Sequence, residues 1–190
     1  MSECSCLQLG QRVPDFDLET YEPVTGDFGR FSLASQIAKK RWTVLFFYPA
    51  DFTFVCASEF AALAEQHERF AAMGVDVLTV STDKASTHLA WREHEKDLAN
   101  VRYSMGADPT GGLSRMFGVY DGRSGAALRG TFIINPDGTL LGSEVNFYNL
   151  ARNIDELARK LKANLYLASG SAAACPAKWR EPEARESPKA

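Results

Sequence analysis

Cysteine is scarce in this chain of 190 residues, which has four, namely Cys4, Cys6, Cys56 and Cys175. They form no Cys-x-x-Cys pair, and the three histidines form no His-x-x-x-His pair, so we expect no metal site. For Cys4 and Cys6, an inert chain terminus is favoured over a soft-metal site or disulfides with neighbouring chains.

Long hydrophobic runs are also lacking. None approaches the roughly 20 apolar residues that a membrane-spanning helix needs, so we expect no membrane insertion. Residues 1–6 contain neither a basic nor a hydrophobic region, so no secretory signal is predicted. These absences favour a cytoplasmic protein, where thiols stay reduced and a cysteine is more often catalytic than structural.

An excess of positive charge is lacking as well. The formal net charge is −3 at pH 7, with 21 basic and 24 acidic residues. Nucleic-acid binding needs a basic footprint, so no nucleic-acid partner is expected. The length suits a single domain with a substantial core.

The most informative segment runs from Pro49 to Cys56, with the sequence Pro-Ala-Asp-Phe-Thr-Phe-Val-Cys. It follows an apolar run, 42–48, that predicts a buried strand, and it precedes residues 59–70, which predict a helix. Cys56 is therefore expected where a strand passes into a helix N-terminus. Backbone N–H groups and the helix dipole favour an anion there, which makes the reactive thiolate the expected form of the cysteine.

Cys56 has an alternative interpretation as a small buried hydrophobic residue, which is the usual state of a lone cysteine. Two neighbours favour a functional role instead. Pro49 fixes the backbone φ angle and shapes a turn. Thr53, three residues before the cysteine, can place a hydroxyl beside the sulfur.

The rest of the chain alternates strands and helices. This alternation predicts an α/β fold with a central sheet covered by helices on both faces. A hairpin turn at Pro136-Asp137-Gly138 adds antiparallel strands, so the sheet should be mixed. Strands are expected at 75–81, 131–135 and 140–145, and helices at 85–98, 113–117 and 153–167.

The C-terminal part differs in composition. Residues 168–174 are small and predict a flexible linker, while the charged, proline-bearing residues after Trp179 predict disorder. The chain should thus consist of a domain, 1–167, and an arm, 168–190. Cys175 lies on that arm, which suits a thiol that must travel to meet its partner.

Three separated segments, in the same order, resemble the typical two-cysteine peroxiredoxins of the alkyl hydroperoxide reductase C and thiol-specific antioxidant family. The segment 49–56 resembles the peroxidatic motif, 128–134 resembles the strand with the active-site arginine, and Cys-Pro-Ala-Lys-Trp at 175–179 resembles the segment with the resolving cysteine. The resemblance extends from about Leu9 to Trp179 and implies a thioredoxin-like fold. One departure is Ala57, where many members have proline.

The resemblance implies a role for each matching residue. Cys56 would attack the peroxide and become a sulfenic acid, and Cys175 of the partner subunit would resolve it to an intersubunit disulfide. Arg129 would supply a cation that favours the thiolate and stabilises charge on the oxygen. Thr53 would orient the peroxide, and Pro49 would shield the thiolate from water.

Two further residues match supporting positions of the family. Glu59 and Arg152 would hold the arginine side chains in place. Each also has a simpler interpretation: Glu59 as an ordinary acid in a first helical turn, and Arg152 as a solvated residue. Arg129 could likewise be a solvated strand-end charge, and Thr53 a helix N-cap. Trp91, in a His-x-x-Trp segment with His88, is interpreted as core packing.

The expected function is therefore that of a thiol peroxidase acting on hydrogen peroxide and organic hydroperoxides, without a cofactor. The resemblance implies an external dithiol reductant, with thioredoxin as the first candidate and a dedicated flavoprotein reductase as the second. It also implies a homodimer, which in many members forms a ring of five dimers. The alternatives are a redox-regulated oligomeric chaperone or peroxide sensor, and a non-catalytic thioredoxin-fold binding module.

Peroxide-sensitive members of the group carry a Gly-Gly-Leu-Gly insertion and a C-terminal Tyr-Phe helix. Here Gly-Gly-Leu-Ser, 111–114, follows the turn 108–110 instead of preceding it, and no tyrosine or phenylalanine follows Tyr166. We therefore predict an enzyme that resists over-oxidation of Cys56.

Overall fold

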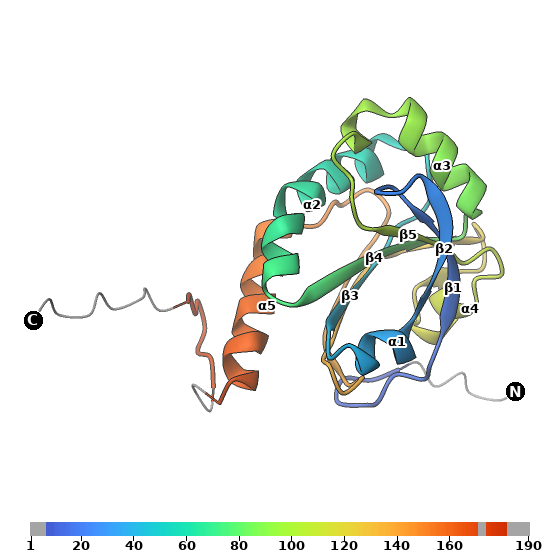
Figure 1. Cartoon of the computed structure of the whole chain (residues 1–190). Helices are drawn as coiled ribbons and strands as arrows, with labels where there is room; N and C mark the ends of the chain where they lie inside the picture. The colour runs from blue at the N-terminus through green and yellow to red at the C-terminus, as the bar shows by residue number, and fades with distance from the viewer. Residues whose placement is uncertain (1–6, 171–173, 182–190) are drawn as a thin grey trace, which may run out of the picture. The chain divides into compact units, whose positions relative to one another are not determined.

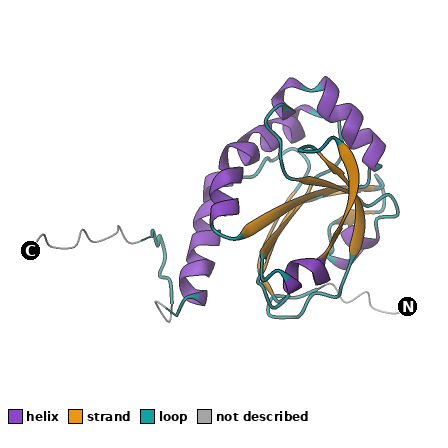
Figure 2. Cartoon of the chain, in the orientation of Figure 1, coloured by secondary structure: helices purple, strands orange, loops and turns teal. Residues whose placement is uncertain are grey.

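The computed structural model describes residues 7–170 and 174–181. The chain divides into two compact units, Met1–Arg152 and Asn153–Ala190, and each is described by itself. The first unit is built on a sheet of seven strands. Figure 1 labels β1 to β5 of this sheet, and Figure 2 draws the strands in orange. Its strands are β1 (Asp17–Glu22), β2 (Asp27–Ser32), β3 (Trp42–Phe47), β4 (Val75–Ser81), β5 (Ser104–Ala107), β8 (Arg129–Ile134) and β9 (Leu140–Asn146).

The strand order is β2-β1-β5-β4-β3-β8-β9. The pairs β3–β4 and β4–β5 are parallel and the others are antiparallel, so the predicted mixed sheet is confirmed. A separate short ribbon consists of β6 (Tyr120–Asp121) and β7 (Ala126–Ala127). The helices of this unit are α1 (Leu33–Ala38), α2 (Phe54–Ala72), α3 (Ala85–His94), the 3-10 turn η1 (Lys96–Leu98) and α4 (Gly112–Met116).

All six residues of β3 are buried, which is what a strand covered on both faces requires. Side chains alternate between the two faces along a strand. Phe47 belongs to the core cluster that also holds Leu33 of α1 and Leu113 of α4. Tyr48, the next residue, contacts Phe60 of α2 and Trp91 of α3, with ring centroids 4.8 and 5.9 Å apart. The helices therefore cover both faces, and Trp91 is a core residue as predicted.

Helix α2 begins five residues earlier than the sequence predicted, at Phe54 instead of Glu59. Thr53 precedes it in an extended conformation, with φ −118°. Phe54 is 84% exposed, and Val55 is β-branched and only half-buried, so the two residues that open the helix show neither core-facing apolar side chains nor high helix propensity. The earlier start places Cys56 inside the first turn of the helix.

The sequence prediction also missed the elements at the β2 edge of the sheet. The hairpin of β1 and β2, helix α1 and strand β5 were not predicted. The hairpin strands carry charged and apolar residues with little alternation in burial, so a period of two is hard to recognise. The helix predicted over 85–98 is confirmed from Ala85 to His94 and wrong over its last four residues, because Glu95 is extended and the 3-10 turn η1 follows.

The second unit contains helix α5 (Ile154–Ala168), close to the predicted 153–167. Asn153 caps it by accepting a hydrogen bond from the Glu156 backbone N–H at 3.1 Å. The buried side chains Ile154, Leu157 and Leu161 follow the helical spacing that the sequence showed. No helix in the described part of the chain is long and apolar enough to cross a membrane.

Residues 174–181 lie against α5. The Trp179 ring is buried and its centroid is 5.5 Å from that of Tyr166, and Arg159 donates to the Trp179 carbonyl at 3.2 Å. The Cys175 sulfur lies 3.9 Å from the Ala163 carbonyl oxygen. Cys4, Cys6, most of the predicted tail and part of the predicted linker lie outside the described residues.

Candidate active site

Cys56 is completely buried and is the third residue of α2. Arg129, the first residue of β8, donates a hydrogen bond from Nη1 to the Cys56 sulfur at 3.4 Å. The sheet explains this proximity. Strands β3 and β8 are antiparallel neighbours, so the start of β8 lies beside the end of β3, from which the chain continues to Cys56. Two residues that are distant in the sequence therefore meet where β3 ends and β8 begins.

Glu59 lies one helical turn after Cys56, on the same face of α2. Its carboxylate is buried and accepts a hydrogen bond from Arg129 Nη1 at 2.6 Å. It also accepts from Arg152 three times: from the backbone N–H at 2.8 Å, from Nε at 2.9 Å and from Nη2 at 3.0 Å. Glu59 is thus a shared acceptor for two buried guanidinium groups. We call Glu59, Arg129 and Arg152 the arginine–glutamate cluster.

Further contacts fix both arginines. Arg152 Nη1 donates to the Gly130 carbonyl at 2.9 Å and to Thr131 Oγ1 at 3.2 Å, and its guanidinium lies 3.3 Å above the Phe46 ring. Arg129 Nε donates to the carbonyl of Tyr148 at 2.7 Å. Burial lowers the pKa of Arg152 while Glu59 opposes that change, and arginine keeps its proton in proteins.

The charges of the cluster do not cancel. Two guanidinium groups against one carboxylate leave one positive charge in a site with almost no solvent contact. A buried charge needs a partner of opposite sign. The Cys56 sulfur, in contact with Arg129, is placed to provide it as a thiolate, and the positive end of the α2 dipole acts in the same direction.

Thr53 occupies the N-cap position of α2, but its side chain makes no capping hydrogen bond. Its hydroxyl donates to the Ala50 carbonyl at 3.0 Å instead. Thr53 is exposed, and its hydroxyl oxygen keeps lone pairs that can accept a further hydrogen bond. Pro49 is half-buried between β3 and α2.

Apart from Thr53 and Pro49, the predicted site residues fall into two groups. Cys56, Glu59, Arg129 and Arg152 lie together in the first unit, so the solvated alternatives for the two arginines and the ordinary first-turn acid for Glu59 do not describe their surroundings. Cys175 belongs to the second unit, and both cysteines are free thiols. The Tyr148 carbonyl was missed, because a backbone acceptor leaves no mark in the sequence.

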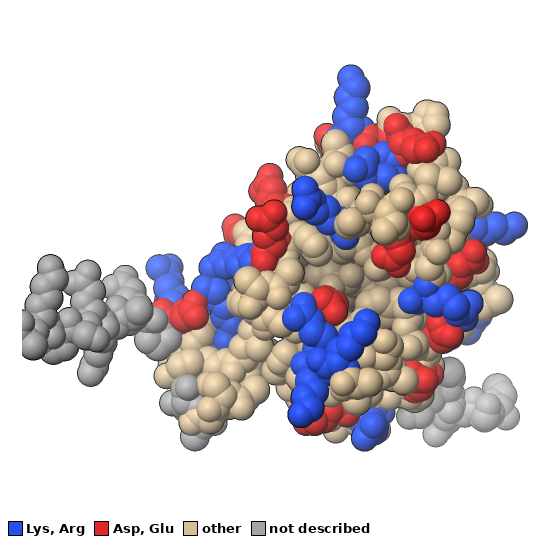
Figure 3. Space-filling view, in the orientation of Figure 1, with Lys and Arg blue, Asp and Glu red and all other residues tan. Residues whose placement is uncertain are grey.

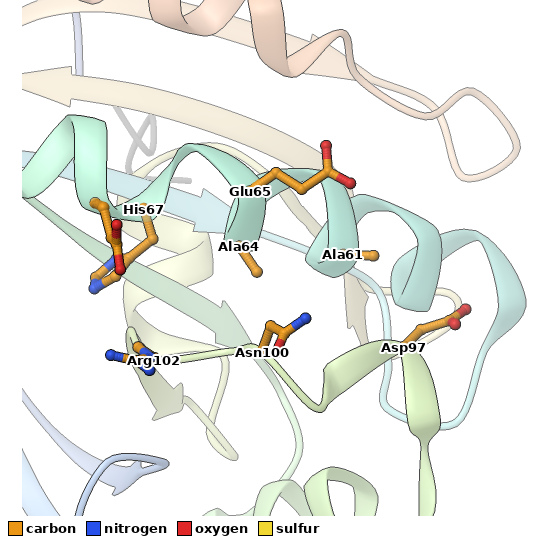
Figure 4. Close-up of a pocket in the computed structure, with 8 residues that line it drawn as sticks. Ala61, Ala64, Glu65, His67, Asp97, Asn100 and Arg102 are labelled. Carbon is orange, nitrogen blue, oxygen red and sulfur yellow. The ribbon is translucent and has the colours of Figure 1, made fainter.

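Other surface features lie apart from this cluster. A groove of about 300 Å³ separates α2 from the segment around η1, and none of the cluster residues lines it. Figure 4 shows the residues that do, namely Ala61, Ala64, Glu65, His67, Glu68, Asp97, Asn100 and Arg102. On the face drawn in Figure 3, basic and acidic side chains are interspersed. Within residues 7–170 and 174–181, no three His, Cys, Asp or Glu side chains are grouped as metal ligands.

A buried cysteine in a first helical turn, with a guanidinium on its sulfur and a mixed sheet covered on both faces, defines a thiol peroxidase of the peroxiredoxin class. The chain belongs to the AhpC/TSA family, whose profile matches residues 9–142. It is 45% identical over 180 residues to alkyl hydroperoxide reductase C of Escherichia coli strain K12, covering 95% of this chain and 94% of that protein.

Other relatives agree. Alkyl hydroperoxide reductase C of Staphylococcus aureus strain Mu50 is 38% identical over 173 residues, covering 91% of this chain and 90% of that protein. The crystal structure of Enterococcus faecalis AhpC has a TM-score of 0.83 at 36% identity, covering 88% of this chain and 98% of that one. The reduced 2-Cys peroxiredoxin of Plasmodium vivax has a TM-score of 0.87 at 29% identity, covering 94% of this chain and 92% of that one.

Proposed function

We propose that this protein reduces hydrogen peroxide and organic hydroperoxides by attack of the Cys56 sulfur on a peroxide oxygen. The observation that carries the proposal is the 3.4 Å hydrogen bond from Arg129 to the sulfur. A sulfur electron pair forms the S–O bond as the O–O bond breaks. The leaving oxygen takes a proton and departs as water or an alcohol, and Cys56 becomes a sulfenic acid.

Three residues assist this step. Arg129 stabilises the charge that develops on the oxygens. Thr53 accepts a hydrogen bond from the peroxide and so orients it, since its own proton is used on Ala50. Pro49 shields the sulfur from water. Glu59 and Arg152 keep the Arg129 guanidinium at the sulfur.

Cys175 of the partner subunit then attacks the sulfenic acid. An S–S bond forms, the sulfenic oxygen leaves as water, and the product is an intersubunit disulfide. The match of residues 175–179 to the resolving segment supports this step, and so does the free Cys175 thiol. A homodimer is supported by β9, which is the last strand of the sheet order and carries the exposed side chains of Leu141 and Val145.

A dithiol protein closes the cycle by passing two electrons to the disulfide. We propose thioredoxin as this reductant and a flavoprotein disulfide reductase as the alternative. We propose that the protein acts in the cytoplasm, where dithiol systems keep thiols reduced. A ring of five dimers is the further assembly that membership of the family suggests.

A steady-state assay tests the proposal. The pure protein, with thioredoxin, thioredoxin reductase and NADPH, should consume hydrogen peroxide and an alkyl hydroperoxide continuously. Cys56→Ser should lose this activity with every reductant, whereas the matched variants Cys4→Ser and Cys6→Ser should keep it. Retention of more than a few per cent of the rate by Cys56→Ser would place the nucleophile elsewhere. Absence of turnover by the wild type with both types of reductant would favour a sensor or chaperone.

A further inference from the structure

Three polar side chains, Tyr48, Asp51 and His88, are buried together and take no part in the chemistry described above. The Tyr48 hydroxyl donates to Asp51 Oδ1 at 2.7 Å, and His88 Nδ1 lies 2.8 Å from Asp51 Oδ2. Burial raises the pKa of Tyr48 well above its ordinary value, so its hydroxyl keeps the proton that it donates. Both oxygens of Asp51 are therefore engaged.

The surroundings of His88 determine where its hydrogens lie. Nε2 is 3.2 Å from the Gly106 carbonyl oxygen, which can only accept, so Nε2 carries a hydrogen. One more proton lies between Nδ1 and Asp51 Oδ2. The pair is therefore either an imidazolium with a carboxylate or a neutral imidazole with a carboxylic acid. In both forms His88 connects α3 and β5 to Asp51.

The backbone of Asp51 is held as well. Its N–H donates to Asp83 Oδ2 at 2.9 Å, and the same oxygen accepts from Ser81 Oγ at 2.8 Å. The next residue, Phe52, has a φ of 57°, in the left-handed region that a phenylalanine rarely adopts. The residue is 57% exposed, so burial does little to offset this strain. The contacts of Asp51 thus help to hold the strained turn that leads to Thr53 and Cys56. The hydrogen bond from the Thr53 hydroxyl to the Ala50 carbonyl and the contact of the Phe52 ring with Trp91 hold it as well.

We propose that His88, acting through Asp51, is a positioning residue that holds segment 49–56 in the conformation in which Cys56 meets Arg129. The inference rests on the proposed function. The Cys56 sulfenic acid forms in a fully buried site, and a thiol from another subunit cannot reach it until segment 49–56 opens. The hydrogen bonds of Asp51 therefore set how often the sulfenic acid meets Cys175 and how often it meets a second peroxide.

The two steps depend differently on this opening. Attack on peroxide needs the closed segment, and disulfide formation needs the open one. While the open form is a small minority, a tenfold rise in its population accelerates disulfide formation about tenfold and leaves the rate of attack nearly unchanged. A general loss of stability would not separate the two rates in this way.

The test is a pair of rapid-mixing measurements on the full-length, reduced protein. One follows oxidation of Cys56 by hydrogen peroxide, and the other follows the appearance of the disulfide by quenched mass spectrometry. His88→Ala should speed disulfide formation about tenfold and keep the rate of attack on peroxide within about twofold. It should also raise the peroxide concentration at which half of Cys56 is converted to sulfinic acid. Tyr48→Phe should change the same quantities in the same direction but less, and it preserves the packing should His88→Ala fold poorly.

Conservative and control variants complete the experiment. His88→Asn keeps an amide that can either donate to Asp51 Oδ2 or accept from it at the position of Nδ1, and it should restore most of the wild-type ratio of the two rates. Tyr103→Phe also loses a buried hydrogen bond, of 2.9 Å to the Phe60 carbonyl, but in the middle of α2, and should leave the ratio unchanged. The inference is overturned if His88→Ala and Tyr48→Phe leave the ratio unchanged, or if Tyr103→Phe shifts it equally. Failure of wild-type Cys56 to react with peroxide would instead overturn the proposed function.

Discussion

Glu59 binds Arg152 through both carboxylate oxygens, with Oε1 2.9 Å from Nε and Oε2 3.0 Å from Nη2. Both side chains are almost fully buried. The same carboxylate also accepts from Arg129, so the guanidinium at the Cys56 sulfur is placed by a contact that itself depends on Arg152. The reactivity of Cys56 should therefore depend on residues that never touch the peroxide.

The hydrogen bond from Arg129 to the Cys56 sulfur gives the first prediction. Arg129→Ala should slow attack on hydrogen peroxide by about 10²–10³, since loss of one such preorganised donor costs roughly 2.7–4 kcal/mol. The second-order rate constant for Cys56 oxidation measures this. Arg123→Ala is the control, because Arg123 is an exposed arginine that pairs with Asp121. Equal rate constants for the wild type and Arg129→Ala would remove Arg129 from the mechanism.

The shared acceptor gives the second prediction. Glu59→Gln leaves two buried guanidinium groups without their carboxylate, and breaking a buried ion pair costs about 3–5 kcal/mol. We expect a large fall in the free energy of unfolding, together with slower Cys56 oxidation, because Arg129 loses its anchor. Denaturant unfolding and rapid mixing measure the two effects.

Glu156→Gln provides the comparison for Glu59→Gln. It breaks a solvent-exposed pair with Arg159 in α5 and should change both quantities little. If the two glutamine variants unfold alike, the buried cluster does not stabilise the fold as its geometry indicates.

These residues also show what the sequence could reveal. Strand β3 and the position of Cys56 at the start of a helix followed from an apolar run and one octapeptide, because both signals are local. Glu59 and Arg152, 93 positions apart, carry no joint signal in composition or spacing. They were assigned through the resemblance to a family, and the antiparallel pairing of β3 and β8 is what brings Arg129 to the same place.

The misses have local causes. Phe54 and Val55 open a helix with residues that are typical of strands, so the start of α2 was placed too late. Asp51 and His88 lie 37 positions apart, so no local pattern joins them. In the His-x-x-Trp segment only Trp91 was given an interpretation, as core packing. The role of an aspartate within the octapeptide could not be seen until its partners were placed by the fold.

Cys175 gives a third prediction. Peroxide should convert the protein to a dimer on non-reducing gels, and dithiothreitol should reverse this. Cys175→Ser should lose the dimer but keep one rapid turnover at Cys56. Cys4→Ser and Cys6→Ser, made in parallel, should still form the dimer. An oxidised wild type that runs as a monomer would mean that resolution occurs within one chain or uses another thiol.

A fourth prediction concerns over-oxidation. The segment after Cys175 contributes one buried aromatic residue, Trp179, within the described residues, and its ring packs on Tyr166 of α5. The 190-residue sequence has no tyrosine or phenylalanine after Tyr166, so we expect the disulfide to form faster than the sulfinic acid, with turnover persisting in the millimolar range of peroxide. Mass spectrometry of Cys56 after turnover measures this. Sulfinate accumulating at low micromolar peroxide would show that the Cys175 segment is held too firmly.

The most direct measurement traps the first intermediate. Reduced Cys175→Ser protein, treated with one equivalent of hydrogen peroxide and then with a sulfenic-acid reagent such as dimedone, should carry the label on Cys56 in nearly every chain. Arg129→Ala combined with Cys175→Ser should be labelled much more slowly. A label on Cys4 or Cys6 with Cys56 still reduced would contradict the account, because the nucleophile would then lie outside the site that Arg129 and Glu59 define.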